Sequence, residues 1–207
     1  MASEPALEPA AAGAPSTPKK AHWLLFCTLA AVIVAADLWT KAWVFERLGI
    51  TLAETPDGRL VPMRHAPIVI VPGLFELEGS INFGAFNGWF GEHTAWLSVI
   101  SFAAVFVIAG FLYSHLRRPP PHRYWFTAAL GLLCGGTLGN FYDRAVLGFV
   151  RDFIKWFVVI DGQEHVWPNF NIADSAICGG VGVLLTLMFL DSKRGRVNSP
   201  ASTPPCH

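Results

Sequence analysis

The sequence predicts a mainly α-helical, polytopic membrane protein with four transmembrane helices and a small extracytoplasmic β-sheet unit. The 207-residue chain is 53% hydrophobic and only 14% charged, whereas a soluble domain is typically about 25% charged. Its apolar residues also gather into four segments that approach the roughly 20 residues that a helix needs to cross a bilayer. The formal net charge of +0 is not the basic excess of a nucleic-acid-binding protein.

The first predicted span covers residues 23–44. Its uncharged part is too short to cross a bilayer alone, so Asp37 and Lys41 must lie within its far end. They are four residues apart and therefore share one helical face, where they can pair. The other three predicted spans cover residues 95–113, 124–141 and 172–190. Together these spans form one membrane domain at residues 23–191, flanked by tails at residues 1–22 and 192–207.

The orientation follows from the Lys and Arg residues in the short loops, which favour the cytoplasmic side. With four spans, three basic clusters fall on one side: Lys19 and Lys20; Arg117, Arg118 and Arg123; Lys193, Arg194 and Arg196. Both termini are then cytoplasmic, and the loops at residues 45–94 and 142–171 face outward. Six tryptophans gather towards that outer side, as in an interfacial aromatic belt: Trp39, Trp43, Trp89, Trp96, Trp156 and Trp167.

The first outer loop predicts short strands at residues 68–71 and 75–78, separated by Pro72 and Gly73. Open strand edges cannot face hydrocarbon, so this unit should rest at or above the membrane surface.

Small residues in the last two spans predict close helix packing. The third span contains Gly131, Gly135 and Gly139, and the fourth contains Gly179, Gly180 and Gly182. Close approach of these two spans would bring Asp152 and Asp174 together.

Asp152 and Asp174 lie where hydrophobic segments meet polar loops. A carboxylate near lipid is costly and usually marks function, and two that meet can share a proton for acid–base chemistry. Simpler interpretations stand beside this one. Asp152 could be merely solvated, and Asn171 could cap the fourth helix. Asp143 with Arg144 is best interpreted as a structural ion pair or helix-end anchor, and Asp37 with Lys41 as a pair that fixes the first span.

Other polar residues occur at the outer ends of the spans, which suggests one shared site. The four cysteines form no CxxC pair and the seven histidines lack ligand spacing, so neither a disulfide framework nor a metal site is expected.

Five motifs, in this order, resemble the bacterial lipoprotein signal peptidase family (signal peptidase II). The resemblance runs from about Trp23 to Asp191. The motifs are Asp37-x-x-Thr40-Lys41, Asn82-x-Gly84-Ala85-Phe86, Gly139-Asn140-x-x-Asp143-Arg144, Val150-x-Asp152-Phe153 and Phe170-Asn171-x-Ala173-Asp174. Members are aspartic endopeptidases of the bacterial inner membrane that cut a prolipoprotein before its diacylglyceryl-modified cysteine.

The resemblance implies a role for each motif residue. Asp152 and Asp174 would be the catalytic pair. Substrate contacts would come from Asn82, Arg144, Val150 and Asn171, with support from Asn140, Asp143, Asp37 and Lys41. It also implies a monomer in contact with membrane lipid, with no cofactor, inhibited by globomycin, and with its site near the periplasmic face.

Two features depart from the family pattern. Arg151 stands at a usually apolar position, where it could contact lipid phosphate or lower the pKa of the neighbouring carboxylate. The stretch from Asp152 to Asp174 is a few residues longer than usual, and we expect an amphipathic interfacial segment and a turn there.

Two functions from other classes remain open: a small proton-coupled transporter or channel, and a non-catalytic factor that binds lipoprotein precursors. The acids at one interface, without an inverted repeat, disfavour the first. The presence of both aspartates disfavours the second.

Overall fold

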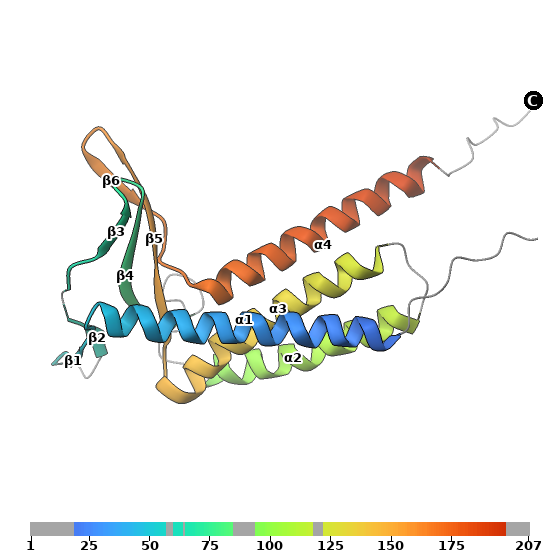
Figure 1. Ribbon diagram of the computed structural model, residues 1–207, viewed down its shortest axis with the longest axis horizontal. Helices are drawn as coiled ribbons and strands as arrows, with labels where there is room; N and C mark the ends of the chain where they lie inside the picture. Colours follow the sequence, from blue (N-terminus) through green and yellow to red (C-terminus); the bar gives the residue numbers. More distant parts are fainter. Residues whose placement is uncertain (1–18, 57–59, 64, 85–93, 118–121, 198–207) are drawn as a thin grey trace, which may run out of the picture.

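The computed structural model of the protein describes residues 19–56, 60–63, 65–84, 94–117 and 122–197. Within them, four long helices run beside one another and the strands lie at one end of the bundle (Figure 1). The helices are α1 (Lys19–Arg47), α2 (Thr94–Arg117), α3 (Arg123–Leu147) and α4 (Ile172–Val197). They cover the four segments that the hydrophobic pattern predicts as spans, and each extends beyond its predicted bounds.

Three of these helices are long and apolar enough to cross a membrane in the described part of the chain: residues 19–47 of α1, 96–117 of α2 and 172–194 of α4. Helix α3 does not reach the same hydropathy, because it combines glycines with buried polar side chains such as Thr127, Asn140 and Asp143. It packs against α1, α2 and α4, so its polar groups lie inside the bundle, away from its outer surface. The structure therefore confirms a mainly helical protein with three apolar helices of membrane-spanning length.

Two antiparallel sheets lie at the end of the bundle where α1 ends. The smaller pairs β1 (Leu52–Glu54) with β2 (Leu60–Pro62), and the larger has the order β3-β4-β5-β6. Its strands are β3 (Ile68–Val71), β4 (Phe75–Asn82), β5 (Val150–Ile160) and β6 (Gln163–Val166). Strands β3 and β4 confirm the prediction for the first outer loop. Leu77 and Ile154, paired in register, join Val44 of α1 in a small core that holds the sheet against the bundle.

The segment after Asp152 differs from the prediction. The expected amphipathic interfacial segment is strand β5, which forms a hairpin with β6 (Figure 1). The predicted turn is present at Asp161 and Gly162, both with positive φ, at 52° and 75°. Two consecutive residues of this kind suit the tight turns that match the twist of paired strands.

The glycines pack partly as the sequence predicts: an added Cβ at Gly180 of α4 would lie 2.9 Å from the carbonyl oxygen of Ala129 on α3, which confirms the close approach of these helices. The glycines of α3 behave differently. An added Cβ at Gly131 or Gly135 would meet α1, at 3.0 Å from Leu29 Cβ and 2.7 Å from Ile33 Cβ. These glycines therefore admit α1, not α4. On α3 the close approach to α4 depends on Gly136, whose added Cβ would lie 2.4 Å from the carbonyl oxygen of Ala173.

Candidate active site

Asp152 lies near the start of β5, where the strand passes the ends of α1 and α3. Its side chain is almost wholly buried, and two amides donate to it. Asn82 Nδ2 lies 3.1 Å from Oδ2, and Asn171 Nδ2 lies 2.7 Å from Oδ1. Asn82 is held nearby because the end of β4 pairs with the start of β5. Asp152 is thus a buried strand residue, not the solvated loop residue that its sequence context allowed.

Asp174 lies in the first turn of α4, and Asn171 caps that helix as the sequence suggested. The Asp174 backbone N–H donates to Asn171 Oδ1 at 2.9 Å, and the Asn171 N–H donates back to Asp174 Oδ2 at 3.2 Å. This reciprocal pair is a capping box with Asp in the place of the usual Glu. Asn140 Nδ2, from α3, donates to the other oxygen of Asp174 at 2.7 Å.

Asn171 therefore contacts both carboxylates. Its side-chain amide donates to Asp152 and its backbone N–H donates to Asp174. Burial first, and the nearby charge of Asp174 second, raise the pKa of Asp152 from an ordinary 3.8 to about 7. Desolvation disfavours a charged carboxylate, and a second negative charge adds to that penalty. Asp152 can consequently hold a proton at neutral pH, which an exposed aspartate cannot.

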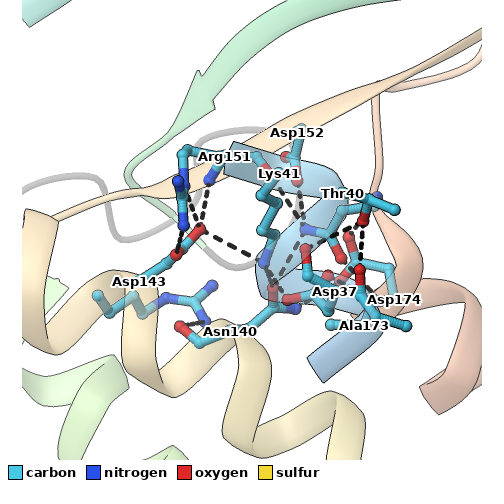
Figure 2. A network of polar contacts seen from close by, with 12 residues as sticks. Asp37, Thr40, Lys41, Asn140, Asp143, Arg151, Asp152, Ala173 and Asp174 are labelled. Atoms are coloured by element: carbon cyan, nitrogen blue, oxygen red, sulfur yellow. Dashed lines mark hydrogen bonds and ion pairs between the residues drawn. The ribbon is translucent and has the colours of Figure 1, made fainter. Parts of the chain in front are cut away.

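A second polar cluster lies beside this pair (Figure 2). Lys41 and Asp37 of α1 form the predicted ion pair, 2.7 Å from Nζ to Oδ2, and both are wholly buried. Lys41 Nζ also lies 3.3 Å from Oδ2 of Asp143, on α3. Among the described residues, no group of three or more His, Cys, Asp or Glu side chains could hold a metal ion.

Asp143 and Arg151 are partners of each other, which the sequence interpretation of neither residue includes. Asp143 pairs with Arg151, not with its neighbour Arg144. The Arg151 Nη2 lies 2.7 Å from Oδ1, while its Nε and its backbone N–H both donate to Oδ2, at 3.3 Å and 3.0 Å. Arg151 is thus committed to Asp143, and it is absent from the charges that set the pKa of Asp152. Asp143 is neutralised by two cations and does not contact the carboxylate pair.

The other residues expected to contact substrate, Arg144 and Val150, have different surroundings. Arg144 donates from Nη2 to the carbonyl of Gly84 at 3.2 Å and from Nη1 to that of Asn140 at 3.5 Å. Its Nε is buried without a hydrogen-bond partner. Val150 is only 2% exposed and pairs in register with Asn82 across β4 and β5. Ala85 and Phe86, from the second motif, lie outside the described residues.

Two site residues escaped the sequence analysis. The backbone N–H of Ala173 donates to Asp37 Oδ1 at 2.9 Å and so ties α4 to α1. A Cβ at Gly139 would lie 2.6 Å from Asp37 Oδ2, so only glycine leaves room for the buried carboxylate. The signal for Gly139 was its place directly before Asn140. No side-chain pattern could reveal the role of a backbone N–H.

Comparisons with known proteins identify the family of the chain. The family model described as signal peptidase (SPase) II matches residues 29–190. A lipoprotein signal peptidase of Xanthomonas campestris pv. campestris and one of Xylella fastidiosa (strain 9a5c) are each 34% identical over 180 residues, covering 86% of this chain and 95% of theirs. The solved structure of a bacterial membrane enzyme has a similar fold, with a TM-score of 0.64 at 20% identity over 89% of this chain and 95% of its own. The chain therefore belongs to the signal peptidase II family.

Proposed function

We propose that the protein is an aspartic endopeptidase that removes the signal peptide from diacylglyceryl-modified prolipoproteins, cutting before the lipidated cysteine. The family supplies the reaction, signal-peptide removal in lipoprotein maturation. The observation that supports the aspartic mechanism is that Asp152 and Asp174 both accept hydrogen bonds from Asn171.

The proposed chemistry needs one proton shared by two carboxylates. The ionised partner takes a proton from a water molecule, which attacks the scissile carbonyl. The protonated partner donates to that carbonyl oxygen and later helps to protonate the leaving amine. The pKa of about 7 at Asp152 supports the presence of that proton at neutral pH. The pair titrates as a unit, so neither role is assigned to a fixed residue.

The proposed substrate contacts come from Asn82, Arg144, Val150 and Asn171. The unpartnered Nε of Arg144 supports a contact with substrate, because a buried N–H without an acceptor is costly and a peptide carbonyl would satisfy it. Asn82 and Asn171 hold Asp152 from two sides, so a peptide bound there would lie against the reacting carboxylate.

We further propose that all four helices cross the bacterial inner membrane, with both termini cytoplasmic and the site near the periplasmic face. The 25 residues of α3 extend about 38 Å, and the packing of this helix against its three neighbours shields its polar side chains from lipid. Two exposed tryptophans near the end of α1, Trp39 and Trp43, suit an outer interface. In this arrangement the protein acts as a monomer in contact with lipid, without a cofactor, and globomycin inhibits it.

Cleavage of a diacylglyceryl-modified prolipoprotein by the purified protein in detergent tests the proposal. Wild type is compared with Asp152→Asn and Asp174→Asn, each with and without globomycin. We expect globomycin-sensitive cleavage by wild type before the lipidated cysteine, and no cleavage by either folded variant. Near-normal activity in either variant would refute the aspartic pair.

A further inference from the structure

A continuous set of buried polar contacts joins α1 to both carboxylates (Figure 2). It begins at Lys41, whose ammonium group has three hydrogens to donate. Its Nζ lies 2.7 Å from Asp37 Oδ2, 3.3 Å from Asp143 Oδ2 and 3.0 Å from Asn140 Oδ1. Two of these acceptors neutralise its charge, and the third is an uncharged amide oxygen of the site.

The contacts of Asn140 determine which way its amide points. Its Oδ1 accepts from Lys41 and also from Asn171 Nδ2, at 3.1 Å. With its oxygen held by two donors, the amide must turn its NH₂ group to the opposite side. There Nδ2 donates to Asp174 Oδ1 at 2.7 Å. A reversed amide would place its NH₂ against the Lys41 ammonium and its oxygen against the Asp174 carboxylate, and both contacts are repulsive.

Asn171 connects Asn140 to Asp152 by hydrogen bonds. The Asn171 Oδ1 accepts from the backbone N–H of Asp174, so its NH₂ group faces Asn140 Oδ1 and Asp152 Oδ1. Asp174 therefore receives an N–H from an amide that Lys41 orients. Asp152 receives one from Asn171, whose side-chain amide is held by the Asp174 N–H on one side and by Asn140 Oδ1 on the other.

We propose that Lys41 is a positioning residue of the cleavage reaction, whose ammonium orients the amide of Asn140 so that Asn140 donates to Asp174 and accepts from Asn171, the donor to Asp152. The inference rests on the proposed function and goes beyond a role for Lys41 in fixing α1. The ammonium touches neither carboxylate of the pair, although its charge lowers the pKa of Asp152 from a distance. The proposed positioning role passes through the amides, and Asn140→Leu, which keeps that charge, isolates it.

The surrounding charges allow this role to be separated from a general charge effect. The groups near the pair are Asp37 and Lys41 from α1, Asp143 and Arg144 from α3, and Arg151 from β5. Arg151 contacts Asp143, as Lys41 does, but its guanidinium hydrogen-bonds to Asp143 and not to Asn140. It therefore provides a control, a partly buried cation on the same carboxylate whose guanidinium lies outside the path to the pair.

The test uses a charge-balanced variant, because Lys41→Met alone would leave an unpaired buried anion, which is strongly destabilising. Asp37→Asn combined with Lys41→Met removes one charge of each sign, and the new amide oxygen can still accept from Ala173 N–H. Asn140→Leu removes the amide and keeps every charge. The control variant is Arg151→Met. For each protein, kcat and KM for a diacylglyceryl-modified prolipoprotein are measured as a function of pH.

We expect kcat of the double variant and of Asn140→Leu to fall by about 10- to 100-fold, the scale of a misplaced catalytic group, while KM changes little. The pH profile should also move to higher pH in both variants, because ionised carboxylates that lose N–H donors are protonated more readily. A purely structural role would reduce the amount of folded protein without moving the profile. Arg151→Met should keep the wild-type position of the profile.

Three outcomes would overturn the inference: a wild-type kcat and profile in the folded double variant, an equal displacement in Arg151→Met, or a wild-type kcat in Asn140→Leu. The last decides the matter even if the double variant does not fold, because the proposed positioning by Lys41 passes through that amide. If Asp152→Asn and Asp174→Asn retain activity in the same assay, the proposed function itself is wrong. If they are inactive while Asn140→Leu matches wild type, only the role of Lys41 is rejected.

Discussion

Replacing Asp152 with asparagine should stabilise the folded protein at alkaline pH, although it removes a proposed catalytic group. Burial and the charge of Asp174 raise the pKa of Asp152 from 3.8 to about 7. A carboxylate whose pKa is raised on folding prefers its proton in the folded state, so its ionisation favours unfolding. The penalty is small below the ordinary pKa, grows as the pH rises, and is complete above about pH 7.

The size of this effect follows from the two pKa values. They differ by about 3, and each unit corresponds to about 1.4 kcal/mol. The ionised Asp152 side chain therefore costs about 4 kcal/mol of folding free energy at pH 8, and below about 1 kcal/mol at pH 4. Asparagine carries no such penalty. It does place an NH₂ group among the amides of Asn82 and Asn171, at a cost of about 1–3 kcal/mol that does not depend on pH.

The measurement is the unfolding free energy of wild type and Asp152→Asn in detergent, followed by tryptophan fluorescence between about pH 4 and pH 8. The variant should gain about 4 kcal/mol relative to wild type across this range. Asp161→Asn, on the exposed hairpin turn, serves as the control and should show no such trend. A constant difference between wild type and Asp152→Asn at all pH values would refute the reasoning.

Three further predictions concern activity and packing. Cleavage by wild type should slow as the pH rises through about 7, because the pair then loses its shared proton; a kcat/KM that keeps rising at alkaline pH would contradict this. Gly136→Ala should reduce cleavage at least tenfold and destabilise the fold by about 1–3 kcal/mol, since its Cβ would lie 2.4 Å from the Ala173 carbonyl and push α4 away. Gly179→Ala, with nothing within 4 Å of the added Cβ, should behave as wild type in both assays. Arg144→Lys should raise KM about tenfold, because lysine keeps the charge without the Nε donor; an unchanged KM would remove Arg144 from the substrate contacts.

Several parts of the site could be predicted because they depend on short-range geometry. Residues four apart share a helical face, so the pairing of Asp37 with Lys41 follows from spacing alone. Asn171 has the side chain of a helix cap and lies directly before an apolar helical segment. The four helices follow equally from the lengths of the apolar segments.

Other parts depend on how distant elements pack, which local sequence does not encode. Asp143 was paired with Arg144 because they are adjacent, but neighbouring residues on a helix point in different directions. Its actual partner, Arg151, reaches it only because β5 crosses the end of α3. The glycine spacing in α3 likewise predicts a close neighbour without saying which one, and the neighbour of Gly131 and Gly135 is α1.

The length of the hairpin formed by β5 and β6 does not determine where the two carboxylates lie. Ile154 and Phe170 bridge the base of the hairpin, with backbone hydrogen bonds of 2.9 Å and 3.2 Å in the two directions. Asp152 and Asp174 lie on one side of that bridge, and the paired residues of the β5–β6 hairpin, from Phe157 to Val166, lie on the other. Paired strands can lengthen two residues at a time without changing which side chains face which way. Residues added in pairs beyond the bridge would therefore lengthen the hairpin without moving Asp152 or Asp174.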